Sequence, residues 1–150
     1  MSRAFIREDV DPPERSGRVR SASGLPPGAI NYITARGARW YRDQLALERA
    51  SGGDPERAAE LDQILASVTV VDPPEAGTSD ITFGATITVE APDGAQKTFT
   101  VVGVEELTLE RDAVSWVSPI GKALLAAEAG GRVISEGENL GRVVKVEYRE

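Results

Sequence analysis

Two residue types are missing from this chain of 150 residues, which contains neither cysteine nor histidine. Without cysteine there can be no disulfide, no thiolate zinc site and no cysteine nucleophile. Without histidine the chain lacks the usual general base near neutral pH and the commonest metal ligand, and a Ser-His-Asp triad is impossible. The composition therefore favours a binding protein over an enzyme.

Long apolar runs and an excess of positive charge are also missing. No apolar run approaches the roughly 20 residues that span a bilayer, and residues 1–10 are charged and lack the apolar centre of a signal peptide. The formal net charge of −7 opposes nucleic-acid binding, because such binding rests mainly on cationic contacts to phosphate. We therefore expect a cytoplasmic protein with no membrane association and no direct sequence-specific DNA binding.

The residues that are present suffice for a folded core. Hydrophobic residues make up 41% of the chain, which is enough for one or two small domains. Residues 1–32 are the exception, since they combine prolines with charged and small polar residues and offer little to bury. We expect them to form a disordered or extended tail.

Residues 33–72 have the period of a short α-helical hairpin. Thr34 is a typical helix N-cap, and apolar residues at steps of three and four predict a helix over 35–50. A Ser-Gly-Gly sequence interrupts this period. Asp54, followed by a proline, then combines an N-cap acceptor with the residue favoured at the first helical position, which predicts a second helix over 55–67.

Beyond this hairpin the period changes to that of strands. Residues 81–89 alternate apolar and polar side chains, as a half-buried strand does, and an Asp-Gly turn leads to a returning strand over 97–104. Further short strands are predicted at 68–71, 114–117, 132–135 and 142–148, with a helix over 120–128. Residues 76–150 are therefore predicted to form an α+β domain, a small antiparallel sheet with one helix.

Several of these segments, taken together and in order, resemble the Gre (GreA/GreB-type) transcription elongation factors. They are FGATITV at 83–89, TFTVVGVEE at 98–106, VSWVSPIGKALL at 114–125 and VKVEY at 144–148. Upstream, YITARG at 32–37 and ASVTVVD at 66–72 resemble the start and the end of the hairpin of that family.

The resemblance implies an N-terminal coiled-coil hairpin on an FKBP-like C-terminal domain. It also implies a partner, since Gre-type proteins bind the rim of the secondary channel of bacterial RNA polymerase through the C-terminal domain. They insert the hairpin into the channel, where acidic residues at the tip help the polymerase to hold a magnesium ion and to cleave backtracked RNA.

The loop that meets the polymerase in the resembling proteins corresponds here to Val117, Ser118, Pro119 and Ile120. An exposed proline followed by an isoleucine at a helix start gives a rigid apolar contact, which loses little conformational entropy on binding. The plainer interpretation is that Ser118 only caps the helix and that Ile120 belongs to the core. The family often has Asp or Asn where this chain has Val117.

The predicted hairpin departs from the Gre pattern in length and at its tip. The first helix is about 24 Å long at 1.5 Å per residue, much shorter than in cleavage factors. Asp54 and Glu56 are two residues apart, whereas the family has an Asp and a Glu three apart. The pair could hold a magnesium ion shared with the polymerase, but helix capping alone also explains both residues. We expect no metal or cofactor of the chain's own.

Arg36, Arg39 and Arg42 step by three along the first helix. Such a row can contact RNA or an acidic channel wall, although a solvated helix face is the more frequent explanation.

Three hypotheses follow. In the first, the chain is a transcription regulator that binds RNA polymerase at the secondary channel without strong stimulation of transcript cleavage, and is not itself an enzyme. In the second, it is a true cleavage-stimulating factor that uses Asp54 and Glu56 as an auxiliary to polymerase catalysis. In the third, the C-terminal domain is an FKBP-like peptide-binding module or prolyl isomerase, for which few aromatic residues are available to line a pocket.

Overall fold

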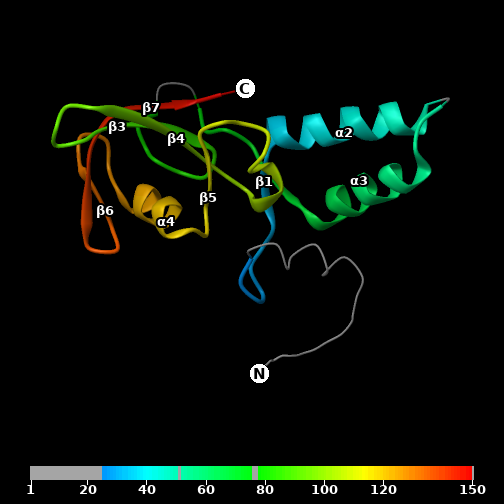
Figure 1. The fold of residues 1–150 in the computed structure, drawn as a ribbon, viewed down its shortest axis with the longest axis horizontal. Coiled ribbons are helices and arrows are strands. Elements are labelled where there is room, and N and C mark those ends of the chain that lie inside the picture. The colour runs from blue at the N-terminus through cyan, green and yellow to red at the C-terminus, as the bar shows by residue number, and fades with distance from the viewer. Residues whose placement is uncertain (1–24, 51, 76–77, 150) are drawn as a thin grey trace.

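The computed structural model describes residues 25–50, 52–75 and 78–149. A helical hairpin projects from one end of a five-stranded sheet, which carries one further helix (Figure 1). The elements in chain order are β1 (Tyr32–Thr34), α2 (Ala35–Arg49), α3 (Pro55–Ser67), β2 (Thr69–Val71), β3 (Ala85–Glu90), β4 (Gln96–Val102), the 3₁₀ turn η1 (Val104–Glu106), β5 (Ala113–Ser115), α4 (Pro119–Ala126), β6 (Arg132–Ser135) and β7 (Glu138–Tyr148).

Local capping starts both helices of the hairpin where the sequence predicts. The side chain of Thr34 accepts a hydrogen bond from Gly37 N at 3.0 Å, and that of Asp54 accepts one from Glu56 N at 3.0 Å. The buried residues that pack the two helices together are Ala38, Tyr41 and Leu45 of α2 with Leu61 and Ile64 of α3. The mixed α+β character expected from the change of period is therefore present.

The base of the hairpin holds a feature that the sequence did not predict. β1 and β2 pair in parallel, with Tyr32 opposite Thr69, and Asn31 O accepts from Thr69 N at 2.8 Å. Asn31 and Tyr32 were assigned to the tail, yet Asn31 is buried and Tyr32 starts a strand. Residues 1–24 of the predicted tail lie outside the described part of the chain.

The larger sheet has the strand order β5-β4-β3-β7-β6. All neighbours pair antiparallel except β4 and β5, which run parallel. This corrects the prediction of a wholly antiparallel sheet. The connection between β4 and β5 contains η1 and crosses over, so that β5 enters the sheet in the same direction as β4.

The central strand β3 begins later than predicted, at Ala85 instead of residue 81. Gly84 adopts φ +94°, and its N–H donates to Val101 O at 2.8 Å while Ala85 N donates to Thr82 O at 3.0 Å. A left-handed residue in a tight turn interrupts the ladder, which the alternation of apolar residues does not reveal.

One face of the sheet is covered by α4, as Figure 1 shows. Leu124 of α4 is fully buried among sheet residues; the buried members of this core are Ala85, Ile87, Val89, Val101, Leu124, Val133 and Val143. The hairpin has its own separate core. Throughout the described residues, no helix has the length and apolar character needed to cross a membrane.

Candidate functional site

The loop between β5 and α4 is held rigid by its own hydrogen bonds. Ser118 is the N-cap of α4: its Oγ accepts from Gly121 N at 3.0 Å and donates to Ser115 O at 2.6 Å. Ser115 Oγ in turn accepts from Val117 N at 3.2 Å. These hydrogen bonds hold the start of α4 from within the loop, in addition to the packing of the helix on the sheet.

Gly121 allows the close approach on which this loop depends. A Cβ atom at this position would lie 2.0 Å from Ser115 O, which is far closer than real Cβ contacts come. The first turn of α4 therefore packs directly on the backbone that ends β5, and only glycine fits between them.

The four loop residues predicted for partner binding have different surroundings. Pro119, the first residue of α4, is exposed, whereas Ile120 is half-buried and packs against the core of the sheet. Val117 and Ser118 are half-buried. The surface that this loop offers is therefore centred on Pro119, and Ile120 serves mainly to hold the helix on the sheet.

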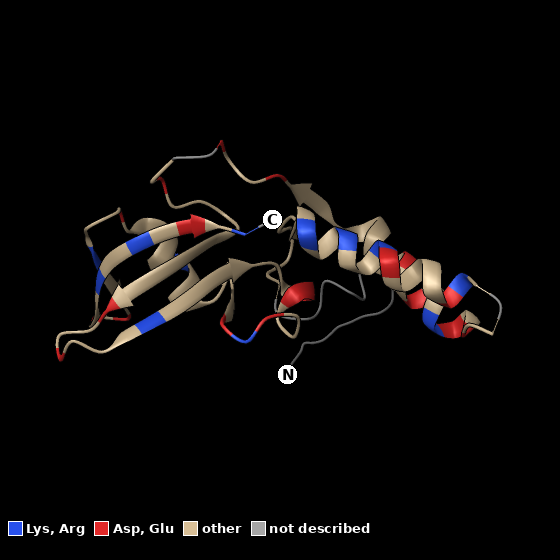
Figure 2. Cartoon of the chain, turned by 90° about the horizontal axis from the view of Figure 1, so that it is seen from above, with Lys and Arg blue, Asp and Glu red and all other residues tan. Residues whose placement is uncertain are grey.

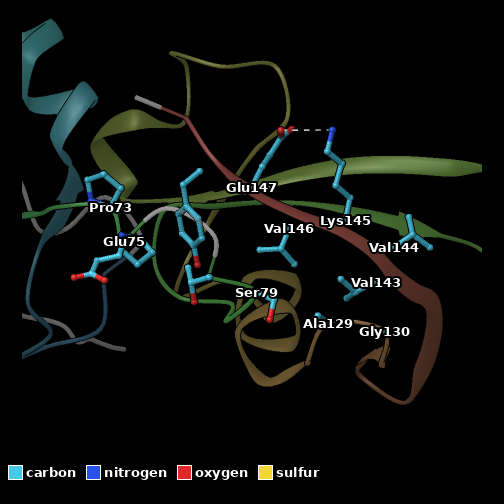
Figure 3. A pocket seen from close by; sticks show the side chains of 13 residues that line it. Pro73, Glu75, Ser79, Ala129, Gly130, Val143, Val144, Lys145, Val146 and Glu147 are labelled. Carbon is cyan, nitrogen blue, oxygen red and sulfur yellow. Dashed lines mark ion pairs between the residues drawn. The ribbon is translucent and has the colours of Figure 1, made fainter.

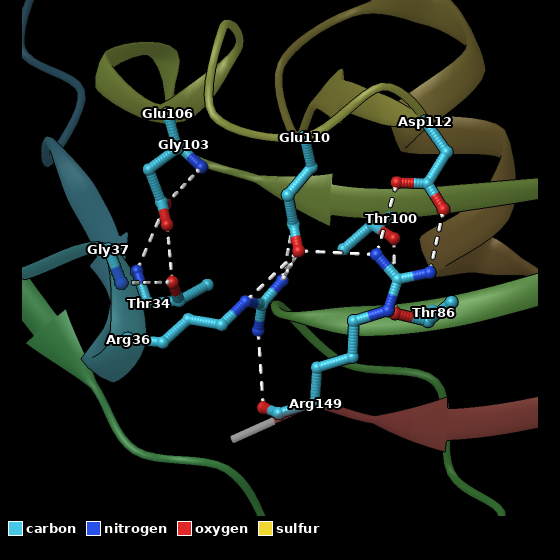
Figure 4. Close-up of polar contacts among 10 residues, drawn as sticks. All are labelled: Thr34, Arg36, Gly37, Thr86, Thr100, Gly103, Glu106, Glu110, Asp112 and Arg149. Carbon is cyan, nitrogen blue, oxygen red and sulfur yellow. Dashed lines mark hydrogen bonds and ion pairs between the residues drawn. The ribbon is translucent and has the colours of Figure 1, made fainter. Parts of the chain in front are cut away.

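Of the predicted arginine row, Arg36 belongs to the junction between hairpin and sheet. Its guanidinium forms an ion pair with Glu110 at 2.6 Å and donates from Nη1 to Arg149 O at 3.2 Å (Figure 4). Arg149 bridges Glu110 at 3.2 Å and Asp112 at 2.9 Å. These contacts tie the first turn of α2 to the end of β7 and to the loop before β5.

Arg39 and Arg42 lie further along α2 and are exposed. Arg39 lines a shallow cavity of about 240 Å³ between the hairpin and the sheet, together with Phe83 and Tyr148. The structure therefore leaves these two arginines of the predicted three available at the surface.

A buried carboxylate that the sequence did not single out joins the same two parts of the chain. Glu106 is 3% exposed and accepts hydrogen bonds from Gly103 N at 2.9 Å, from Thr34 N at 3.0 Å and from the Thr34 hydroxyl (Figure 4). A Cβ on Gly37 would lie 2.1 Å from Glu106 Oε1. The N-terminus of α2 is thus built around this carboxyl group.

Burial raises the pKa of Glu106, and the hydrogen bonds from Thr34 and Gly103 oppose that rise. The only sequence signal for this group is a pair of acids, Glu105 and Glu106, within an otherwise apolar stretch. Both acids are buried, and Glu105 accepts from Asn31 Nδ2 at 3.3 Å.

The far end of the hairpin carries the two predicted tip carboxylates. Asp54 and Glu56 are both exposed. Asp54 caps α3, and its backbone N–H donates to Glu48 Oε1 at 3.0 Å, so the tip is closed by contacts within the hairpin. The geometry matches the capping interpretation, and both carboxylates face solvent.

Comparison with known proteins shows which family the sequence is similar to. The family model for the C-terminal part of the GreA/GreB transcription elongation factors matches residues 75–148. The transcription elongation factor GreB of Neisseria meningitidis serogroup B is 30% identical over 124 residues, which cover 79% of this chain and 76% of that protein. GreA of Magnetococcus marinus is 37% identical over 129 residues, covering 85% and 80%.

The chain belongs to the GreA/GreB family. A solved structure, the transcription elongation factor GreA/GreB from Nitrosomonas europaea, is 26% identical, covers 80% of this chain and 99% of its own, and superposes with a TM-score of 0.42.

For this GreA/GreB-family protein, the stretch matched by the family model contains the whole β5–α4 loop and Glu106. Charge is distributed unevenly on the remaining part, the hairpin (Figure 2). Arg36, Arg39 and Arg42 lie in the first half of α2. Toward the tip, the acids Glu48, Asp54, Glu56 and Glu60 outnumber the arginines Arg49 and Arg57.

Proposed function

We propose that this GreA/GreB-family protein binds bacterial RNA polymerase at the secondary channel and stimulates transcript cleavage weakly or not at all. The polymerase contact is made by the five-stranded sheet with α4, called the sheet unit below. The observation that carries the proposal is the exposed Pro119 on a loop that is rigid before any partner arrives. A preorganised apolar contact loses little entropy on binding, so a small surface can contribute useful affinity.

The short hairpin supports the proposal that stimulation of transcript cleavage is weak or absent. The 15 residues of α2 span about 22 Å, and the 13 residues of α3 about 20 Å, at 1.5 Å per residue. A catalytic carboxylate must come within hydrogen-bond or coordination distance of the reacting atoms. A short arm anchored at the channel rim keeps Asp54 and Glu56 away from the polymerase active site. In this role the protein needs no metal or cofactor of its own.

The exposed arginines give the hairpin a second means of contact. Arg39 and Arg42 face outward near the sheet unit, where they would meet an acidic channel wall or the RNA in it. The contribution of such exposed charges falls with added salt. We also propose that the sheet unit has the FKBP-like fold that the resemblance to Gre factors implies.

Binding to purified RNA polymerase tests the proposal directly, with Pro119→Ala as the variant and Pro55→Ala as its matched control. Both prolines are exposed and occupy the first position of a helix, so each substitution has a similar effect on its own helix. We expect Pro119→Ala to weaken binding by about tenfold and Pro55→Ala by less than about twofold. Equal affinities for the two variants would remove the β5–α4 loop as the contact.

A cleavage assay on backtracked elongation complexes tests the role of the tip. We expect the wild-type chain to leave the rate of transcript cleavage close to that of polymerase alone, and Asp54→Ala and Glu56→Ala to change nothing. Strong cleavage that disappears in either variant would establish the cleavage-stimulating alternative instead.

A further inference from the structure

Three half-buried aromatic rings meet at the junction between the hairpin and the sheet. Tyr32 comes from β1, Phe83 from the turn before β3, and Trp116 directly follows β5. The ring centroids of Tyr32 and Trp116 lie 5.1 Å apart at an interplanar angle of 65°, and that of Phe83 lies 5.7 Å from Tyr32 and 6.5 Å from Trp116. Tilted and edge-to-face rings at such separations attract each other beyond the effect of burying their area.

The end of β4 holds two of these rings through its backbone. Trp116 N donates a hydrogen bond to Val102 O at 3.0 Å. A Cβ atom on Gly103 would lie 1.8 Å from Tyr32 O, so the glycine lets β1 pass directly against the backbone that follows β4. Tyr32 and Trp116 are therefore brought together by two consecutive residues of the same strand end.

β1 connects the aromatic cluster to the core of the hairpin. Successive side chains of a strand point to opposite faces, so Ile33 faces away from its neighbours Tyr32 and Thr34. Ile33 is fully buried in the hairpin core, whereas the Thr34 hydroxyl binds Glu106. On the other side of the contact, Trp116 packs against the core of the sheet. The cluster therefore joins the two separate cores of the molecule.

Trp116 also belongs to the β5–α4 loop that presents Pro119. Ser115, one residue before it, accepts at its carbonyl oxygen from Ser118 N at 3.1 Å and from Ser118 Oγ at 2.6 Å. A displacement of Trp116 therefore displaces the N-cap of α4 with it. The polar contacts of the junction hold the start of α2, whereas the aromatic rings reach the loop itself.

We propose that Tyr32 and Trp116 are positioning residues, whose contact sets the direction of the hairpin relative to the β5–α4 loop. The consequence for transcription rests on the proposed function: when Pro119 binds RNA polymerase, the same contact directs the hairpin into the channel. Without this contact the loop still binds, but the hairpin samples several directions.

The distance between two spin labels on the free chain tests the positioning without polymerase. Because the chain contains no cysteine, Ala59→Cys on α3 and Lys145→Cys on β7 give two unique labelling sites. Both positions are exposed, and Lys145 lies on the wall of a groove of about 670 Å³ beside β7 (Figure 3). We expect pulsed EPR to give one narrow distance distribution, which Tyr32→Leu widens by about twofold or more.

Tyr32→Phe is the matched control, because it keeps the ring and removes only the hydroxyl group, and it should leave the distribution narrow. Phe99→Leu removes a half-buried ring from the sheet core and controls for a loss of stability alone. Trp116→Leu acts from the other side of the contact, so its combination with Tyr32→Leu should widen the distribution no more than either substitution does. A distribution that stays narrow in Tyr32→Leu or in Trp116→Leu overturns the proposal.

A photo-crosslinker attached at Ala59→Cys tests the consequence in the complex with RNA polymerase. Tyr32→Leu should bind polymerase within about twofold of the wild-type affinity, because Pro119 and its loop are unchanged. The yield of crosslinks to polymerase should fall by about threefold or more, since the effective concentration of the label at the channel wall is lower.

A yield that stays unchanged in Tyr32→Leu, or that falls only in parallel with affinity, contradicts the positioning role. A wild-type chain that does not bind polymerase refutes the proposed function instead, and the EPR distances on the free chain then decide the positioning by themselves.

Discussion

At the scale of single residues, Glu106 shows how one side chain joins the two parts of the molecule. Its carboxylate accepts from Thr34 at the start of α2 and from Gly103 at the end of β4. A buried acceptor of this kind stabilises the fold mainly because its removal leaves donors without partners. Glu106 therefore acts on the stability of the fold by holding the start of α2 to the end of β4.

Replacing Glu106 by alanine should destabilise the protein by about 2–4 kcal/mol, since the N–H groups of Thr34 and Gly103 would be left buried and unpaired. Glu106→Gln should cost less than about 1 kcal/mol, because the amide oxygen can accept from both N–H groups while its NH₂ donates to the Thr34 hydroxyl. Urea unfolding of the three proteins measures the difference. A glutamine variant as unstable as the alanine variant would show that the negative charge itself is required.

The raised pKa of Glu106 makes stability depend on pH in a defined direction. A carboxyl with a raised pKa binds more protons in the folded state than in the unfolded state between its two pKa values. The stability it contributes is therefore full below its ordinary pKa and is lost as the pH rises through the folded pKa.

We expect the free energy of unfolding of the wild type to fall relative to that of Glu106→Gln as the pH rises above the ordinary pKa of a glutamate. Glu138→Gln, at an exposed strand position, controls for the change in net charge. Parallel curves for the wild type and Glu106→Gln would contradict the assignment.

Residue-scale features that depend on local sequence were predictable, and those that depend on distant contacts were not. Thr34, Asp54 and Ser118 cap helices as their sequence neighbourhoods indicate, because a cap binds an N–H only two or three residues away. The roles of Glu106 and Arg36 were missed, since their partners lie 72 and 74 residues away.

At the scale of elements, the attachment of α2 to the sheet depends on the group of Arg36, Glu110, Arg149 and Asp112. The side chains of Arg36 and Glu110 are 17% and 21% exposed, so their ion pair is screened less than one on the open surface. Together with the hydrogen bonds of Glu106, the group holds the start of α2 against the sheet.

A double-mutant cycle of Arg36→Ala and Glu110→Ala should give a coupling energy of about 1 kcal/mol. Arg39→Ala, one turn along the same helix and exposed, should change stability by less than about 0.5 kcal/mol. Denaturant unfolding provides both values. A coupling energy near zero would mean that packing alone holds α2 to the sheet.

Sequence patterns located the helices of this protein but did not predict how all of its strands pair. Helical periods and turn residues located α2, α3 and α4 closely, because each depends on its own residues. Short strands were predicted close to β2 and β5, but their parallel pairing with β1 and β4 was not, because the period of a strand does not say which strand it pairs with or in which direction.

At the scale of the whole molecule, two contacts with RNA polymerase are proposed: Pro119 on the sheet unit and the exposed arginines of the hairpin. The distance between Pro119 and the acidic tip is fixed by the junction around Glu106 and Arg36. On the proposed function, such a protein would occupy the entrance of the channel and keep its own carboxylates distant from the polymerase active site. It should therefore compete with longer members of the GreA/GreB family.

The most direct measurement is a competition assay, in which transcript cleavage by backtracked polymerase is driven by a fixed amount of a cleavage-stimulating Gre factor. Adding the wild-type chain should reduce cleavage to the level of polymerase alone, and Pro119→Ala should require about tenfold more protein than Pro55→Ala for the same effect. Cleavage that rises with added chain, or that stays unchanged at concentrations where the chain saturates polymerase, would contradict the proposed function.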